Sequence, residues 1–264
     1  MKPLIVLGFT LLSAAAAELP GWKLVWSDEF DKPGKPDPAK WGQESGMIRN
    51  DEKQFYTVAR TENARVEDGH LIIEARKESH EGAQFTSASL TTQGHAEWTF
   101  GRIEVRAKLP AARGTWPAIW MLPTDIGTLG WPKCGEIDIM EHVGHDATVI
   151  HGTLHTETYN HMKGTQRGVT RKVPDFDTKF HSYAVEWTKD KISMSIDGEP
   201  FAGFERKEGD TAAEWPFDKP FYLILNLAIG GSWGGQKGID DTAFPQRMEV
   251  DFVRIYQKSD SATR

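Results

Sequence analysis

The pattern that most constrains this chain is the alternation of apolar and polar residues with a period of two, interrupted at short intervals by glycine and proline. Such alternation is typical of β-strands that are buried on one face. It occurs at residues 71–75, 101–109, 183–187, 192–196 and 249–256. Amphipathic patterns with the helical period are missing. The sequence therefore predicts an all-β fold of many short strands, as in sandwiches and barrels.

Two further segments support this prediction. Asp197 and Gly198 follow the strand at 192–196 and form a strong hairpin signal. Residues 221–229 are almost wholly apolar, which indicates a strand that is buried on both faces. Neither a linker nor an internal repeat divides the chain. We expect one domain over residues 18–257, followed by a polar tail at 258–264.

The first 17 residues have the features of an export signal. Lys2 precedes an apolar run at residues 4–12, and small residues at 13–17 offer a cleavage site after Ala17. A buried N-terminal strand is the alternative. The run is shorter than the roughly 20 residues that span a bilayer, and no later segment is long and apolar enough. We therefore expect a secreted or periplasmic protein that does not reside in a membrane.

The charge of the chain is mildly acidic. The whole chain carries a formal charge of −7, and removal of Lys2 with the signal makes it one unit more negative. Such a surface argues against nucleic acid or an anionic membrane as the partner. Cys134 is the only cysteine, so no intramolecular disulfide can form.

The most informative segment for function is the acidic strand at residues 136–141, with the sequence EIDIME. Strict alternation places Glu136 and Asp138 on one face and Glu141 on the other. One extra residue, a β-bulge, would return Glu141 to the face of the other two. Three carboxylates on one face repel one another, which is costly unless they share protons.

Such a set of carboxyl groups suits glycoside hydrolysis. A retaining enzyme needs two of them roughly 5 Å apart, one as nucleophile and one as acid/base. A third can hold a proton between them and raise the pKa of the acid. From the spacing alone, a solvated edge strand with its acids on the wet face explains the pattern as well.

Aromatic residues surround this strand in the sequence. Trp116 and Trp120 are four residues apart and share one face of a strand. Asn226 and the glycine-rich loop at 230–235, which contains Trp233, supply an amide and another indole. A flat aromatic ring can pack on a sugar, although each of the 10 tryptophans can equally belong to the core.

In these segments the sequence resembles glycoside hydrolase family 16, and within it the laminarinase-like enzymes that cleave β-1,3-glucans. The resemblance extends over essentially the whole mature chain, and the extra Met140 is similar to the bulged form of the catalytic strand. The residues that carry it are 24–30, 50–57, 100–104, 116–122, 135–141, His181, Trp187, Asn226, 230–231 and 250–254.

The resemblance implies a β-jelly roll of two curved antiparallel sheets with a substrate cleft on the concave face. It implies Glu136 as nucleophile, Glu141 as general acid/base and Asp138 as their hydrogen-bonding assistant. It also implies a monomeric endo-β-1,3-glucanase or mixed-linkage β-1,3(4)-glucanase that needs no catalytic cofactor. The cleft residues that match the family pattern are Asn50, Glu52, Trp116, Trp120, Trp131, His155, Asn226 and Trp233.

The family often binds a structural calcium ion on the convex side. The matching positions are the backbone oxygens of Glu29 and Gly69 and the carboxylate of Asp251, which are ligands that Ca²⁺ accepts. An outward-facing acid on a strand is the alternative for Asp251. Ser89 and Asp51 depart from the family pattern, in which arginine and asparagine are frequent, and this leaves subsite preference open.

Three other functions compete with a β-1,3-glucanase. His151 and His155 could bind zinc, but on a strand they lie about 13 Å apart, and no glutamate follows His151 as in a metalloprotease. A non-catalytic β-glucan-binding protein would lack the catalytic glutamates, which this chain keeps. The same mechanism could act on lichenan, agarose or carrageenan, yet no basic cluster is available for a sulfated substrate.

Overall fold

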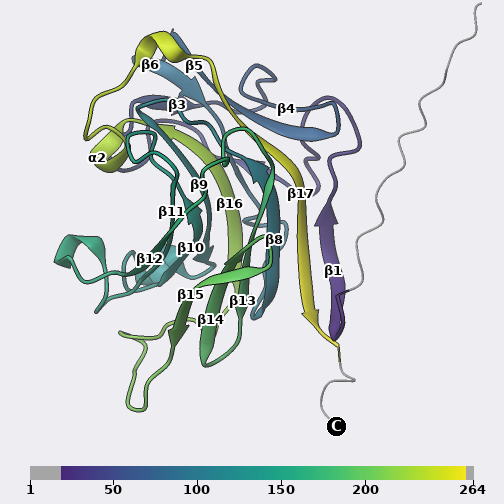
Figure 1. Ribbon diagram of the computed structural model, residues 1–264, viewed down its shortest axis with the longest axis vertical. Coiled ribbons are helices and arrows are strands. Elements are labelled where there is room, and N and C mark those ends of the chain that lie inside the picture. Colours follow the sequence, from purple (N-terminus) through teal and green to yellow (C-terminus); the bar gives the residue numbers. More distant parts are fainter. Residues whose placement is uncertain (1–18, 260–264) are drawn as a thin grey trace, which may run out of the picture.

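Two curved β-sheets packed face to face make up the computed structural model, which describes residues 19–259 (Figure 1). The predicted signal at residues 1–17 lies outside this range. The helices are short: α1 (Ile126–Leu129) and α2 (Gly231–Gly234), with 3-10 turns at His161–Lys163 and Asp241–Ala243. Within the described residues, no helix has the length and apolar character needed to cross a membrane.

The larger sheet follows the order β15-β14-β13-β8-β17-β5-β6-β3, with β1 paired to β17 and β4 paired to β5. Its pairs are antiparallel except β3 with β6. Its strands are β1 (Trp22–Asp28), β3 (Gln54–Tyr56), β4 (Ala64–Glu67), β5 (His70–His80), β6 (Ala83–Ser87), β8 (Gly101–Lys108), β13 (His181–Trp187), β14 (Lys191–Ile196), β15 (Glu199–Glu205) and β17 (Gln246–Lys258).

The smaller sheet follows the order β12-β11-β10-β9-β16-β7-β2 and is antiparallel throughout. Its strands are β2 (Gly42–Gln43), β7 (Ser89–Thr91), β9 (Thr115–Pro123), β10 (Glu136–Glu141), β11 (Val149–His155), β12 (Arg167–Lys172) and β16 (Phe221–Ile229). Together the two sheets confirm the predicted all-β sandwich, and the structures compared below share its jelly-roll form.

The hydrophobic core lies between the two sheets, and the alternation of side chains decides what enters it. On β16, Leu223, Leu225 and Leu227 join the core, whereas Asn226 lies on the opposite face of the same strand. Every residue of β16 is buried, as the apolar run predicted. The hairpin between β14 and β15 turns at the predicted Asp197 and Gly198. The outer face of the smaller sheet is therefore left free to form the site.

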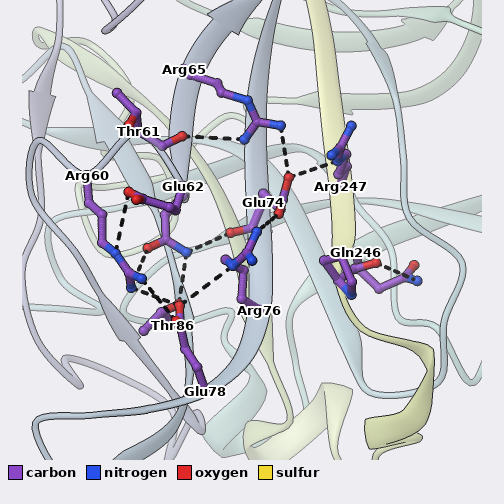
Figure 2. A network of polar contacts seen from close by, with 12 residues as sticks. Arg60, Thr61, Glu62, Arg65, Glu74, Arg76, Glu78, Thr86, Gln246 and Arg247 are labelled. Carbon is purple, nitrogen blue, oxygen red and sulfur yellow. Dashed lines mark hydrogen bonds and ion pairs between the residues drawn. The ribbon is translucent and has the colours of Figure 1, made fainter.

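A cluster of ion pairs ties together three strands of the larger sheet (Figure 2). Glu74 on β5 has a side chain only 1% exposed. Its carboxylate accepts from Arg65 on β4 at 3.0 Å and pairs with Arg247 on β17 at 2.8 Å and with the neighbouring Arg76. A buried carboxylate is tolerated only when it is paired. The three arginines therefore hold β4, β5 and β17 in register around one buried charge.

Candidate active site

A cleft of about 1190 Å³ lies on the free face of the smaller sheet. All eleven residues that the sequence predicted for catalysis and substrate binding line it. They are Asn50, Glu52, Trp116, Trp120, Trp131, Glu136, Asp138, Glu141, His155, Asn226 and Trp233. They come from four strands of the sheet, β9, β10, β11 and β16, from α2, and from loops that border the cleft.

The predicted β-bulge is present on β10. The pairing of β10 with β9 and with β11 shifts register after Asp138. Ile139 and Met140, although consecutive, both belong to the core between the sheets, and Glu141 lines the cleft. One additional residue thus points inward, and Glu141 rejoins the face of Glu136 and Asp138.

A glycine immediately before β10 sets the start of the catalytic strand. Gly135 has φ +86°, a conformation that side chains other than glycine rarely adopt. A Cβ atom at this position would lie 2.7 Å from Cγ of Pro216. Glycine is therefore required by both backbone and packing one residue before Glu136.

The deepest part of the site is a cluster of Glu136, Asp138 and His155. Their side chains are 15%, 3% and 8% exposed, respectively. Nε2 of His155 lies 3.4 Å from Oδ2 of Asp138 and 3.8 Å from Oε1 of Glu136. Burial lowers the pKa of His155 to about 4, so its imidazole is neutral at neutral pH.

Burial raises the pKa of all three carboxyl groups on β10. The pKa of Asp138 rises well above its ordinary value, through burial and then the charges of Glu136 and Glu141. Burial and the charge of Glu141 raise the pKa of Glu136 to about 8, and burial raises that of Glu141 to about 7. Because each charge disfavours the next, the three groups titrate as a set.

The distribution of protons follows from these environments. Burial and the neighbouring charges keep Asp138 protonated, and it lies in hydrogen-bonding contact with Glu136, so it can donate to that carboxylate. Glu136 and Glu141 then share one proton near neutral pH, because a charge on Glu141 raises the pKa of Glu136. These values place the shared proton mainly on Glu136 in the free site, so the reactive arrangement, with Glu136 ionised and Glu141 protonated, is the minor one of the two, and the hydrogen bond from Asp138 to Glu136 favours it.

Glu141 lies beside two tryptophans. The indole N–H of Trp116 donates to Oε1 of Glu141 at 2.9 Å and favours the charged form of this carboxyl group. The ring of Trp116 meets that of Trp233 edge to face, with centroids 5.5 Å apart. His151, which pairs with Glu141 across β10 and β11, packs against the other side of Trp233 at 4.8 Å.

A continuous chain of hydrogen bonds crosses the floor of the cleft. The indole of Trp120 donates to Oδ1 of Asn226 at 2.7 Å, and Nδ2 of Asn226 donates to the hydroxyl of Tyr56 at 3.0 Å. Tyr56 donates to Glu52 at 3.2 Å, and Gln54 donates to the same carboxylate at 2.6 Å. The chain fixes the side chains of Asn226 and Glu52, because each polar group in it has a partner.

The loop that carries Asn50 packs on the glycine-rich loop. Asn50 and Asp51 have φ values of 54° and 55°, a left-handed conformation that both asparagine and aspartate tolerate. Aspartate at position 51 is therefore compatible with the backbone here. The amide of Ser232 donates to the carbonyl of Asn50 at 2.9 Å, and a Cβ atom on Gly231 would lie 2.9 Å from that carbonyl. Gly231 permits this close approach.

Arg49 also lines the cleft and was not predicted from the sequence. Its guanidinium lies over the ring of Trp120, 4.8 Å from the centroid, and is bonded to Glu44. Ser89 donates to the same carboxylate at 2.5 Å. Arg49 covers a ring that is itself only 9% exposed, so a sugar that reaches this part of the cleft meets the guanidinium edge. No local pattern marks Arg49, because its role depends on the fold.

Trp131 borders the cleft near Glu136. Its ring lies 5.9 Å from that of His155 and 4.9 Å from that of His161. Its indole nitrogen is buried and lies close enough to Glu136 to favour the charged form of that carboxyl group. His161 was not predicted as a cleft residue, and Gly164 closes the short turn that presents it.

The histidines that raised the question of zinc are separated by the fold. His151 and His155 lie at opposite ends of the paired region of β11, beside Glu141 and Glu136, respectively. His142 is buried outside the cleft, where Nδ1 lies 2.9 Å from the carbonyl of Val149. A zinc site built on His151 and His155 together is therefore not formed.

The predicted calcium residues lie together on β17 and its neighbours, away from the cleft. Glu29 comes directly after Asp28, which pairs with Val253 on β17. Gly69 comes directly before His70, and Nε2 of His70 lies 3.6 Å from Oδ1 of Asp251. Asp251 is the extra residue at a register shift of β17, and its carboxylate pairs with Arg106. Carbonyl and carboxylate oxygens are ligands that Ca²⁺ accepts, but a cation must displace the guanidinium of Arg106 to reach the carboxylate of Asp251.

The fold and the carboxyl groups define a glycoside hydrolase with its site on the open face of a jelly roll. The model of the glycosyl hydrolases family 16 matches residues 51–254. The chain belongs to this family. It is an enzyme of the laminarinase-like type, as the sequence predicted.

Three known proteins show how far the similarity extends. The chain is 52% identical to a beta-glucanase of Rhodothermus marinus over 262 residues, which cover 96% of this chain and 92% of the relative. The structure of the laminarinase from Rhodothermus marinus matches with a TM-score of 0.89 and 54% identity, covering 92% of this chain and all of the other. SCLam, a non-specific endo-beta-1,3(4)-glucanase, matches with a TM-score of 0.87 and 48% identity over 92% of this chain and 94% of its own.

Proposed function

We propose that this protein cleaves internal linkages of β-1,3-glucans of the laminarin type, including mixed-linkage β-1,3(4)-glucans, with retention of configuration. The observation that carries this proposal is the bulged strand β10, which brings Glu136, Asp138 and Glu141 to one face of a long cleft. Similarity to a laminarinase and to an endo-beta-1,3(4)-glucanase supports the choice of glucan.

In the first step, Glu141 acts as the acid and Glu136 as the nucleophile. Glu141 gives its proton to the glycosidic oxygen while a carboxylate oxygen of Glu136 bonds to the anomeric carbon and the C–O bond to the leaving sugar breaks. Asp138, neutral and in contact with Glu136, favours the charged nucleophile until it attacks. As the negative charge of Glu136 is lost in the ester, electrostatic repulsion within the buried set falls.

In the second step, Glu141 acts as the base. Having lost its proton, it accepts one from water, and the oxygen of that water attacks the anomeric carbon and breaks the ester to Glu136. The indole of Trp116 holds Glu141 by one oxygen and stabilises the charged form that exists between the two steps.

The charge of the cleft favours a neutral polysaccharide. Among the described residues that line it, five carry carboxyl groups and one, Arg49, carries a guanidinium, which Glu44 already pairs. The lining carboxyl groups are Glu44, Glu52, Glu136, Asp138 and Glu141. A sulfated galactan would find no unpaired lysine or arginine in this lining to pair with its sulfate groups. Lichenan, a mixed-linkage glucan, falls within the proposal, and carrageenan, which is sulfated, fits less well. Agarose is uncharged, so the choice of a glucan over agarose rests on the similarity to glucanases.

Release of reducing sugar from laminarin, lichenan and agarose tests the proposal. We expect laminarin to be cleaved to a series of short oligosaccharides, with the β-anomer appearing first by NMR. An α-anomer as the first product contradicts the retaining mechanism. Binding of laminarin without release, by wild type as by Glu136→Gln, indicates a glucan-binding protein instead.

We further propose that the enzyme acts outside the cytoplasm as a monomer. The export signal predicted at residues 1–17 supports secretion, and a polymeric substrate too large to enter a cell is consistent with it. Detection of the chain in culture medium or periplasm, without residues 1–17, tests the location. Sedimentation of the mature chain tests the oligomeric state.

We also propose a structural role for Ca²⁺ at the backbone oxygens of Glu29 and Gly69 and the carboxylate of Asp251. A bound cation would join β1, β17 and the turn before β5, whereas Arg106 neutralises Asp251 without it. Calcium should raise the melting temperature of wild type but not of Asp251→Asn, measured with and without a chelator. An equal rise in both proteins contradicts this site.

A further inference from the structure

The cluster at the base of the cleft has the geometry of a transition-metal site. Glu136, Asp138 and His155 each offer one ligand atom, and these atoms lie within 4.8 Å of one another. Nε2 of His155 lies 3.4 Å from the oxygen of Asp138 and 3.8 Å from that of Glu136. Zinc bonds of about 2.0–2.2 Å at the tetrahedral angle set neighbouring ligand atoms about 3.4 Å apart. Small rotations of the glutamate would complete such a set.

The polar atoms of this cluster are poorly satisfied by the protein itself. Oδ2 of Asp138, on a side chain 3% exposed, has no hydrogen-bond partner among the described residues and is aimed at His155. Nδ1 of His155 is likewise buried without a partner. Buried polar atoms are normally paired. An atom that is unpaired and faces two other potential ligands indicates a place where a bound group can be held.

We propose that Glu136, Asp138 and His155 form an inhibitory site for a divalent transition-metal ion such as Zn²⁺. The fourth position of the tetrahedron faces the open cleft, where water can occupy it. Binding of the ion releases the protons that Asp138 and Glu136 otherwise hold, because only the charged carboxylates act as metal ligands. The bound ion engages the oxygen of Glu136 that would attack the sugar, so metal and glucan exclude each other.

The donor set predicts which metals bind. One imidazole and two carboxylates suit Zn²⁺, Ni²⁺ and Cu²⁺, whereas Mg²⁺ and Ca²⁺ prefer six or more oxygen ligands. The site lacks a partner for Nδ1 of His155, and loss of such support typically costs 10- to 100-fold in affinity. We therefore expect reversible binding, weaker than in a structural zinc site.

Isothermal titration of ZnCl₂ into the protein tests the site. His155→Gln and Glu136→Gln each remove a ligand and should weaken binding by more than about 100-fold, beyond the effect of a lost supporting group. His95→Gln makes the same change at an exposed histidine outside the cleft and should bind as wild type does. Circular dichroism shows whether each variant is folded. If His155→Gln does not fold, the zinc affinity of Glu136→Gln alone tests the site.

Equal affinity in the folded ligand variants and wild type refutes the site, as does an equal heat from MgCl₂. Laminarin oligosaccharides should compete with ZnCl₂, and ZnCl₂ should raise the apparent KM of hydrolysis with kcat unchanged. The prediction of inhibition rests on the proposed function, because it needs a protein that cleaves glucan. The titration measures metal binding alone and does not need that activity. Zinc binding that depends on His155 in a protein that cleaves no glucan would therefore refute only the proposed function.

Discussion

The hydrogen bond from Trp116 to Glu141 allows a quantitative test of how the acid is tuned. Trp116→Phe keeps an aromatic ring against Trp233 and removes the indole N–H that donates at 2.9 Å, together with the part of the ring that packs near Gly231. That donor favours the charged form of Glu141, whose pKa burial otherwise raises to about 7. Its loss should therefore raise the pKa of Glu141 further.

The magnitude follows from the cost of a hydrogen bond to a charged group, about 1.5–3 kcal/mol. One pKa unit corresponds to about 1.4 kcal/mol. Because the cleft is open to water, which can replace part of the lost bond, we expect a rise of about one unit. Glu141 must be protonated to act as the acid, so activity is lost as pH rises through its pKa. The basic limb of kcat/KM, which reports loss of the proton that Glu136 and Glu141 share, should move to higher pH by up to about one unit.

The assay is the pH dependence of kcat/KM on laminarin, which reports the free enzyme. Trp233→Phe is the matched control, because Trp233 also lines the cleft but makes no hydrogen bond to Glu141. Its basic limb should stay in place. A limb that does not move in Trp116→Phe, that moves to lower pH, or that moves equally in the control refutes the reasoning.

Three further predictions concern other parts of the molecule. Glu136→Gln should lower kcat by about 10⁴-fold or more, because the nucleophile is lost. Its melting temperature should be no lower than that of wild type, because the substitution removes a buried repulsion. A lower melting temperature would contradict this. Arg49→Met should lower kcat/KM on laminarin by about 10-fold, about 1.4 kcal/mol, and Arg49→Lys should restore part of it; equal losses would point to packing alone. Glu74→Gln should lower the free energy of unfolding, measured in urea, by on the order of 2 kcal/mol, because three arginines lose their shared partner. KM should not change. Unchanged stability would show that the arginines find other partners.

The local pattern of the sequence was sufficient for the strands, and the family resemblance identified which of them is catalytic. Alternation predicted which faces are buried, and the hairpin after β14 followed from its turn residues. The spacing in EIDIME allowed a bulge, the family resemblance of Met140 implied it, and the structure shows Ile139 and Met140 both in the core. These features depend on residues that are close in sequence, because the two-residue period of a strand decides which face each side chain occupies.

What remained open was set by contacts between distant segments. The spacing of the acids was equally compatible with a solvated edge strand, and only the tertiary structure places β10 between β9 and β11, with burial that raises the pKa values of its acids. Arg49 reaches Trp120, and Asn226 reaches Tyr56 across 170 positions of sequence. Such pairs produce no periodic pattern in the sequence, because they depend on the register of the whole sheet.

The sequence by itself thus determined the all-β fold, the bulged acidic strand and the family. The tertiary structure decided how the site works: His155 lies against Asp138 and Glu136, Trp116 holds Glu141, and Arg49 covers Trp120. The physical reason is that strand formation follows from local alternation, whereas proton affinity follows from burial and neighbouring charge. These arise only when the sheets have closed around the core.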